Sequence, residues 1–152
     1  MPNIRPAKIQ DCAEIARLHL LLWPECELIE EKRHIEALLS TGRCGTMPAA
    51  VFVAEATDGT LVGFLEAGLR SHADGCEVSR HVGFVEGWFV QQEYRGLGLG
   101  RALMLSAENW ARKQNAIEMA SDALITEEGS FRAHRALGFE VVDRCVHFRK
   151  SL

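Results

Sequence analysis

The sequence lacks the features that mark several classes of protein. Its longest run without a charged residue, Cys44–Ala54, is far shorter than the roughly 20 residues that a membrane-spanning helix needs. The N-terminal Met1–Pro6 contains no apolar signal stretch. The five cysteines form no Cys-x-x-Cys pair, and the six histidines form no His-Glu-x-x-His set. We therefore expect a soluble, cytoplasmic protein with reduced thiols, no metal and no membrane partner.

Positive charge is also in short supply. The 17 lysines and arginines are outnumbered by 21 aspartates and glutamates, and the formal net charge is −4. Proteins that neutralise nucleic-acid phosphates usually carry the opposite balance, so we expect no nucleic-acid partner, whereas a cationic small molecule suits this charge. The 152 residues, of which 47% are hydrophobic and 25% charged, predict a single domain over residues 1–152.

The pattern of apolar residues predicts a mixed α/β fold. Asp58-Gly59 between two apolar runs is a strong signal for a β-hairpin. The expected strands are residues 4–7, 51–56, 61–69, 82–90 and 118–121, with a final strand pair over 139–150, and the expected helices are residues 11–23, 28–39, 98–115 and 128–137. Neighbouring strands followed by strands that alternate with helices indicate a mixed sheet.

A glycine-rich segment between a predicted strand and the longest predicted helix is the most specific local feature. Its residues are Arg95-Gly96-Leu97-Gly98-Leu99-Gly100-Arg101. Glycines let backbone amides approach a ligand closely, and the helix that follows adds its unpaired N–H groups and positive dipole end. Such a loop can hold a phosphate or pyrophosphate, with the two arginines as flanking cations. A tight turn without a ligand is the alternative.

The spacing separates this loop from two other phosphate-binding loops. Arg101-Ala102 stand where a nucleoside triphosphate P-loop has Lys-Ser/Thr. The third glycine comes one residue too early for the dinucleotide fingerprint, and Gln91–Arg95 separate the strand from the first glycine. Asp122 lies about where a ribose-binding acid could stand, so nucleotide binding stays open as an alternative.

Two stretches carry a resemblance to a known superfamily. Gln91–Gly100, read as Gln-x-Glu-Tyr-Arg-Gly-x-Gly-x-Gly, resembles the acetyl-coenzyme A loop of the GNAT N-acetyltransferases, and His134–Phe139 is similar to their later helix and the Gly-Phe after it. The resemblance implies a twisted, mostly antiparallel mixed sheet with helices on both faces, and acetyl-CoA as co-substrate. The residues that it implies for coenzyme binding are Phe89, Val90, Arg95, Gly96, Leu97, Gly98, Leu99, Gly100 and Arg101.

Five further strings, in order along nearly the whole chain, resemble a group of bacterial aminoglycoside 6′-N-acetyltransferases. They are Leu22-Trp23-Pro24, Asp74-Gly75-Cys76, Phe84-Val85-Glu86-Gly87, Met119-Ala120-Ser121-Asp122 and His147-Phe148-Arg149-Lys150. This resemblance implies acetyl transfer to the 6′-amine of an aminoglycoside by direct attack in a ternary complex. It also implies a homodimer and a role in antibiotic resistance.

Acidic residues suit a cationic acceptor, and one of them can take the proton of its ammonium group. Glu86 interrupts an apolar strand, where a buried acid is costly unless it is satisfied. The resemblance implies that Glu86 and Asp122 lie beside the reacting amine, either of them as base, and that Asp143 holds distal amino groups. It further implies that Trp23 walls the sugar site, where cation–π attraction is available, and that His72 partly replaces an aromatic residue of that group. For these residues, solvent exposure, turn capping or core packing is the alternative.

Two other candidates concern proton transfer and covalent chemistry. Many GNAT enzymes use a tyrosine as the acid for the leaving thiolate, and His134 stands at that position here. Packing of the ring on a helix face and protonation of the thiolate by solvent are the alternatives. Thiol catalysis through Cys44 or Cys76 is a separate hypothesis, and neither thiol has a histidine or acid placed beside it in the sequence.

Three functional alternatives stay open at this stage. One is acetylation of another polyamine, and a second is acetylation of a small-molecule amine or a peptide N-terminus. The third is a non-catalytic sensor that binds acyl-CoA without turnover. Release of free CoA that depends on an added amine separates the enzymes from the sensor.

Overall fold

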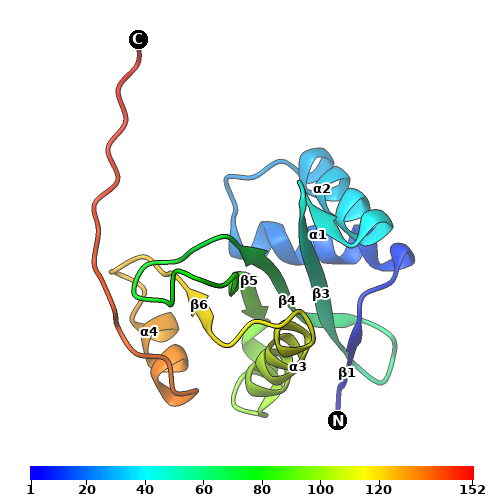
Figure 1. Ribbon diagram of the computed structural model, residues 1–152. Coiled ribbons are helices and arrows are strands. Elements are labelled where there is room, and N and C mark those ends of the chain that lie inside the picture. The colour runs from blue at the N-terminus through cyan, green and yellow to red at the C-terminus, as the bar shows by residue number, and fades with distance from the viewer.

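The computed structural model describes residues 1–152 (Figure 1). Its strands are β1 Asn3–Pro6, β2 Arg43–Cys44, β3 Met47–Glu55, β4 Leu61–Arg70, β5 Val82–Val90 and β6 Met119–Ser121. Its helices are α1 Cys12–Leu22, α2 Leu28–Thr41, α3 Leu99–Lys113 and α4 Glu128–Ala136, with short 3-10 turns at Ile9–Asp11 and Gln92–Tyr94. None of the helices has the length and apolar character needed to cross a bilayer.

One six-stranded sheet organises the molecule. The strands lie in the order β1-β3-β4-β5-β6, and β2 pairs with the start of β3. Every pair is antiparallel except β5–β6, which is parallel. The hairpin between β3 and β4 turns at Gly59, whose φ of +86° lies in the left-handed region that favours glycine. The mixed, mostly antiparallel sheet that the sequence predicted is confirmed.

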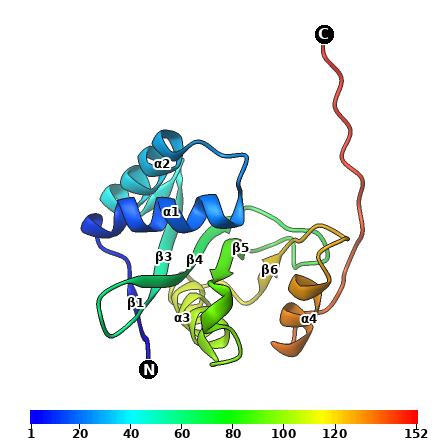
Figure 2. The same cartoon turned by 180° about the vertical axis from the view of Figure 1, so that it is seen from behind.

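Helices cover both faces of the sheet, as Figures 1 and 2 show. On one face, Ile15 and Leu18 of α1 and Ile35 of α2 pack with Phe64 of β4. On the other, Leu103 of α3 packs with inward-facing residues of β3, β4 and β5. Because β4 is covered on both faces, all of its residues from Leu61 to Leu69 are buried. This arrangement explains the continuous apolar run seen in the sequence.

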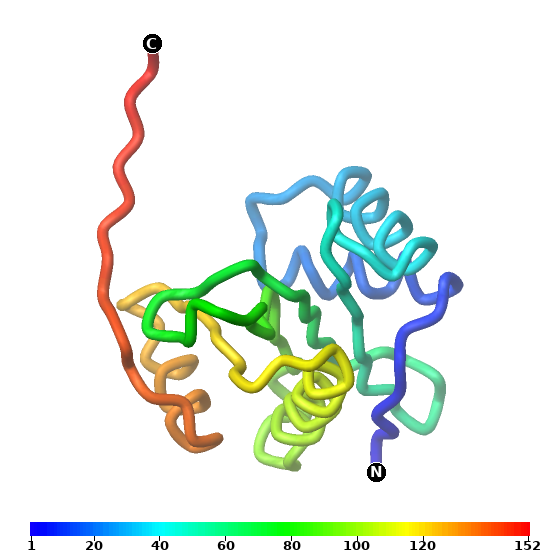
Figure 3. Tube along the Cα trace, in the orientation of Figure 1, coloured from blue at the N-terminus to red at the C-terminus, as the bar shows by residue number.

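The C-terminal segment differs from the prediction. The expected strand pair over residues 139–150 is absent, and the chain beyond α4 runs away from the sheet as an extended arm (Figures 1 and 3). Residues 140–152, which we call the C-terminal arm, are all exposed. Val142 meets the loop between β4 and β5, where a Cβ added to Gly75 would lie 2.6 Å from the Val142 Cβ. A strand needs a neighbour for its backbone hydrogen bonds, and no other strand of this chain supplies one here.

Candidate active site

The two parallel strands, β5 and β6, lie at one end of the sheet and separate after a short paired stretch. β5 pairs with β6 only at Gly83, Phe84 and Val85, and the last pair is Val85 with Ser121. Beyond that pair β5 continues to Val90, hydrogen-bonded to β4 on one side only. The backbone of residues 86–90 therefore presents a free edge on the side toward β6, to which an extended ligand can hydrogen-bond. We call the Val85–Ser121 pair the strand junction.

A β-bulge lies at the strand junction. Glu66 of β4 pairs with Gly87 of β5, whereas the next residue, Ala67, pairs with Val85, so that Glu86 is the extra residue. Bulges turn a side chain out of the regular alternation and often occur at binding sites. Glu86 is consequently an exposed residue, not the buried acid of an apolar strand that the sequence suggested.

The side chain of Glu86 is held by Arg70. Arg70 Nε donates to Glu86 Oε1 at 3.0 Å and Arg70 Nη2 donates to Oε2 at 2.8 Å. The Arg70 guanidinium also stacks over the Phe84 ring, 3.4 Å from its centroid. The hydrogen-bonded Glu86 carboxylate raises the pKa of Arg70, and Asp122 adds to the same effect. Two carboxylates thus share one cation beside the strand junction.

The second carboxylate, Asp122, directly follows Ser121 at the end of β6 and is exposed. No side chain of this chain donates a hydrogen bond to it. Its carboxylate therefore stays free to accept a proton or a hydrogen bond from a bound amine.

The glycine-rich loop leads from the free edge of β5 into α3. Gly96 and Gly98 have φ angles of +80° and +81°, and Gly98 is the N-cap of α3. The amides of residues 96–98 donate to no acceptor of this chain, and the first amides of α3 add further unpaired donors. These N–H groups and the positive end of the helix dipole can bind an anion without any lysine.

The flanking residues of this loop have structural contacts of their own. Arg95 Nε donates to the Val90 carbonyl at 2.8 Å, which ties the loop to the end of β5. Arg101 Nη2 donates to the Ala136 carbonyl of α4 at 3.2 Å. A Cβ added to Gly100 would lie 3.1 Å from the Trp88 ring, so the helix start packs closely on β5.

Trp23 forms a wall beside the bulge. It follows α1, and its ring lies against Gly87, where an added Cβ would come within 2.5 Å of the Trp23 Cη2 atom. The ring meets His19 edge-to-face with 5.1 Å between centroids, and Phe64 at 6.3 Å. Trp23 therefore stands on the α1 and α2 face of the sheet and contacts Gly87, the residue after Glu86.

A buried His–Glu network beneath Trp23 was missed by the sequence reasoning. His19 is fully buried, and its Nδ1 lies 2.6 Å from Glu31 Oε2. Its Nε2 has no hydrogen-bond partner and lies 3.7 Å from Glu66 Oε2. Glu66, 4% exposed, also binds His34 Nε2 at 2.8 Å through Oε1, and this hydrogen bond raises the pKa of His34. The available signal was Glu66 itself, an acid inside an apolar run.

His134 of α4 lies on the other side of the strand junction. Its Nδ1 donates to the Ser130 carbonyl at 2.7 Å, and its Nε2 shares a 2.7 Å hydrogen bond with Ser121 Oγ. The ring makes edge-to-face contacts with Trp88 at 5.3 Å and Phe139 at 5.2 Å between centroids. The side chain thus links α4 to the last residue of β6.

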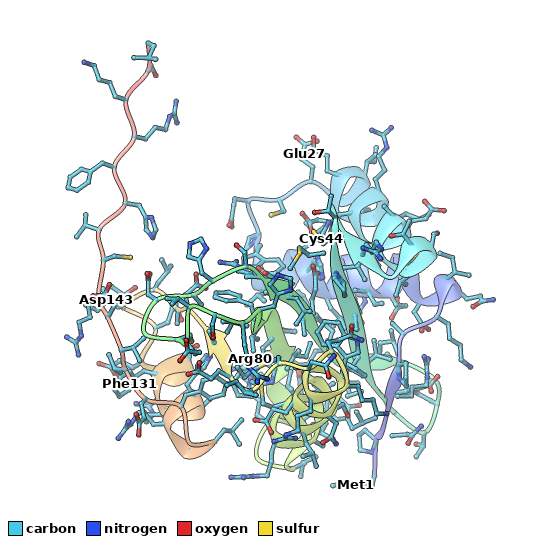
Figure 4. The ribbon with its side chains drawn as sticks, viewed as in Figure 1. Met1, Glu27, Cys44, Arg80, Phe131 and Asp143 are labelled. Atoms are coloured by element: carbon cyan, nitrogen blue, oxygen red, sulfur yellow. The ribbon has the colours of Figure 1, made fainter.

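Two of the predicted substrate residues are not brought to this site. His72 is exposed in the loop after β4 and contacts only Ser71 Oγ, at 3.1 Å. Asp143 lies on the C-terminal arm, away from the sheet (Figure 4), and its carboxylate accepts only from the Arg144 amide, at 2.7 Å.

The cysteines do not form a nucleophilic site. All five thiols are free. Cys44 lies in the short strand β2, and Cys76 follows Gly75 in the loop after β4. Desolvation raises the pKa of both thiols, which disfavours the thiolate that nucleophilic catalysis requires.

A splayed pair of parallel strands, a free strand edge and an anion-binding helix start beside it define an acyltransferase that uses a coenzyme as donor. The chain belongs to the acetyltransferase (GNAT) family, whose profile matches residues 12–139. This match confirms the resemblance seen in the sequence motifs.

Relatives and solved structures agree with this family. The chain is 41% identical over 152 residues to "Aminoglycoside N(6′)-acetyltransferase type 1" of Stenotrophomonas maltophilia, covering 99% of this chain and 94% of the relative. It is 40% identical over 151 residues to the protein of that name from Klebsiella aerogenes, covering 99% and 97%. Among solved structures, AAC(6′)-Iy in complex with the bisubstrate analogue CoA-S-monomethyl-acetylneamine superposes with a TM-score of 0.88 at 30% identity, covering 100% and 99% of the two chains. AAC(6′)-Ih from Acinetobacter baumannii gives 0.86 at 29% identity, with the same coverage.

Proposed function

We propose that this protein transfers the acetyl group of acetyl-CoA to the 6′-amine of an aminoglycoside by direct attack in a ternary complex, and that residues 1–152 form one catalytic unit. The observation that carries the proposal is the strand junction, where the free edge of β5 meets the carboxylates of Glu86 and Asp122. The full-length similarity to proteins named aminoglycoside N(6′)-acetyltransferase supports the choice of acceptor.

The donor binds between β5 and α3. Its diphosphate accepts hydrogen bonds from the amides of residues 96–101, and its pantetheine arm extends along the free edge of β5 at Phe89 and Val90. Arg95 and Arg101 act mainly as braces of this loop, because each donates to a backbone carbonyl of this chain. This placement brings the thioester to the strand junction, close to the carboxylates that are proposed to bind the acceptor amine.

The acceptor binds on the face that Trp23, Glu86 and Asp122 line. A bound ammonium must lose a proton before its nitrogen can attack the thioester carbonyl. Asp122 is the better placed base, directly or through a water, because Arg70 occupies both oxygens of Glu86. Glu86 serves as an anchor for the cationic sugar, and its charge becomes fully available when the acceptor's ammonium replaces Arg70.

The C-terminal arm supports a homodimer as the working form. Val142, Val146 and Phe148 recur on one side of an extended backbone, and the latter two are 74% and 93% exposed. The sheet ends at β6, whose outer edge has no partner in this chain. Exposed apolar strands and free sheet edges pair readily with a second copy, so we propose that each arm pairs with the partner subunit. If each arm pairs with the partner subunit, Asp143 on the arm and His72 in the loop after β4 can lie at the dimer interface and contribute to an acceptor site there.

Acceptor-dependent thiol release tests the proposal. Purified protein with acetyl-CoA should release free CoA when tobramycin or kanamycin is added, and neither spermidine nor an N-terminal peptide should match that rate. Coenzyme binding without release by any amine would indicate the sensor alternative. Faster release with spermidine or the peptide would reassign the acceptor.

Cellular location and biological role follow from the same reaction. We propose that the protein acts in the cytoplasm, where acetyl-CoA is made, and that acetylation there protects a bacterium from the antibiotic. Expression in a susceptible strain should raise the inhibitory concentration of tobramycin, whereas the Asp122→Asn variant should not.

A further inference from the structure

The Ser121–His134 hydrogen bond has a chemical consequence for the donor side of the reaction. When the amine attacks the thioester, a C–N bond forms, the C–S bond breaks, and its electron pair goes to sulfur. A thiol of ordinary pKa, about 8.5, leaves far more readily when a proton or a strong hydrogen bond reaches its sulfur in the transition state. We propose that Ser121 is the catalytic residue that delivers this proton and that His134 supplies it to Ser121. This inference rests on the proposed function.

The position of Ser121 is the first argument. It is the last residue of β6 that pairs with β5, directly opposite Val85, and is half-buried. A coenzyme arm that runs along the free edge of β5 must end its thioester near this junction, because Glu86 and Asp122 on either side of it bind the acceptor. Ser121 directly precedes Asp122, so its hydroxyl is carried by the residue next to the proposed base.

The hydrogen bonds of His134 are the second argument. The Ser130 carbonyl can only accept, so Nδ1 of His134 carries a hydrogen. Nε2 then faces Ser121 Oγ at 2.7 Å. In the imidazolium form, Nε2 donates to Oγ, which leaves the hydroxyl hydrogen of Ser121 free to point at the sulfur. The neutral form reverses this bond and accepts the Ser121 hydrogen.

The proton balance closes without any further reactant. The Ser121 hydroxyl proton passes to the departing sulfur as the Nε2 proton of His134 passes to Ser121 Oγ. His134 becomes neutral while Nδ1 keeps its own hydrogen, which it still donates to the Ser130 carbonyl, and solvent restores the proton on Nε2. The proton of the attacking nitrogen leaves separately, to the carboxylate side. The proton that the sulfur receives and the proton that the amine loses therefore pass through different groups.

Packing fixes the geometry of this pair and connects it to the coenzyme loop. The His134 ring is held edge-to-face between Trp88 and Phe139. Trp88 in turn packs against Gly100 at the start of α3, part of the proposed diphosphate site. The ring that supplies the proton thus rests on the same strand and helix start that bind the donor. Such rigid support is what a proton-transfer pair requires.

The test compares variants with two donors that differ in one atom. Ser121→Ala and His134→Gln should each lower kcat with acetyl-CoA and tobramycin about 100-fold. The double variant should be no worse than the slower single variant, because the two residues act as a unit. Ser121→Thr, which keeps the hydroxyl on a β-branched strand residue, should recover to within about threefold of wild type. The matched control Ser106→Ala removes a hydroxyl that bonds the Ala102 carbonyl within α3 and should leave kcat unchanged.

The second donor is the acetyl selenoester of selenocoenzyme A, whose selenol is a much stronger acid and leaves without help. The deficit of Ser121→Ala and His134→Gln should shrink to about threefold with this donor, while their affinity for CoA stays at the wild-type value. An equal deficit with both donors, or full activity of Ser121→Ala with acetyl-CoA, would overturn the proton relay alone. A wild-type protein that is inert toward tobramycin would instead overturn the proposed function and the relay with it.

Discussion

Arg70 holds both carboxylate oxygens of Glu86, at 3.0 and 2.8 Å, across the bulge of β5. Its guanidinium therefore occupies a position that suits an ammonium group of the acceptor, with Asp122 close enough to add to the raised pKa of Arg70. Since Arg70 donates hydrogen bonds to Glu86 and none to Asp122, the two carboxylates are expected to play different roles. That difference can be measured.

Substitution of Asp122 should change mainly kcat, and substitution of Glu86 should change mainly KM. Asp122→Asn should lower kcat for tobramycin about 100-fold with little change in coenzyme affinity, because it removes the proposed base. Glu86→Gln should act mainly on KM, raising it about tenfold through loss of one charge-assisted contact. Steady-state kinetics with both substrates varied measures the split. The reverse pattern would exchange the two roles, and wild-type constants in Asp122→Asn would remove Asp122 from the site.

A charge placed in the glycine-rich loop should strongly weaken coenzyme binding. Gly98→Asp introduces a carboxylate and a Cβ at a φ of +81°, where amides are proposed to bind the diphosphate. The dissociation constant for CoA should rise at least about 30-fold, or about 2 kcal/mol, by calorimetry. Gly59→Asp is the matched control, because Gly59 has a φ of +86° in a distant hairpin and nothing within 4 Å of an added Cβ. Equal loss in both variants would point to backbone strain, and unchanged affinity of Gly98→Asp would refute the loop assignment.

The hydrogen bond between the partly exposed His34 and the buried Glu66 should make stability depend on pH. The hydrogen bond to Glu66 raises the pKa of His34 above its ordinary value of about 6.5. The stabilisation is fully present below that unfolded-state value and is lost as the pH rises through the raised, folded-state pKa. The Tm of wild type should therefore exceed that of His34→Gln by more at pH 6 than at pH 9.

The size of this pH effect is limited by solvent. The His34 side chain is 38% exposed, so screening should keep the pair near or below about 1 kcal/mol, or a few degrees in Tm. His81→Gln is a control, because His81 is exposed and has no hydrogen-bond partner in this chain. A difference between wild type and His34→Gln that grows toward pH 9 would contradict the assignment.

Charges placed on the C-terminal arm should dissociate the proposed dimer. Val146→Asp and Phe148→Asp together remove two exposed apolar side chains from the segment that is proposed to pair with the partner subunit. Size-exclusion chromatography with light scattering should find wild type as a dimer and the variant shifted toward monomer by at least about tenfold in dissociation constant. Leu105→Asp, on the exposed face of α3 at 53% exposure, is the control. A monomeric wild type would exclude the paired arm.

Local chemistry made much of this fold predictable. The hairpin follows from Asp58-Gly59 and the start of α3 from Gly98, because both glycines adopt left-handed angles that few other residues tolerate. The apolar run of β4 indicates a strand buried on both faces, which the two core clusters explain. The hairpin, the start of α3 and the buried strand β4 can be predicted because each depends on residues that are adjacent in the sequence.

The remaining features depend on contacts between distant parts of the chain. Glu66 is buried because His34, 32 residues away, satisfies one of its oxygens, and no periodicity indicates such a pairing. Glu86 is exposed because a bulge shifts the register between β4 and β5. The C-terminal arm has the alternation of a strand, but its missing neighbour cannot be inferred from the arm's own residues.

The most direct measurement of the proposed reaction compares two antibiotics that differ at one position. Neomycin carries an amine at the 6′ carbon, and paromomycin carries a hydroxyl there with the rest of the molecule unchanged. Transfer to the 6′-amine predicts rapid CoA release from acetyl-CoA with neomycin and release at least about 100-fold slower with paromomycin. Equal rates with the two antibiotics would show that another amine is acetylated and would contradict the proposed reaction.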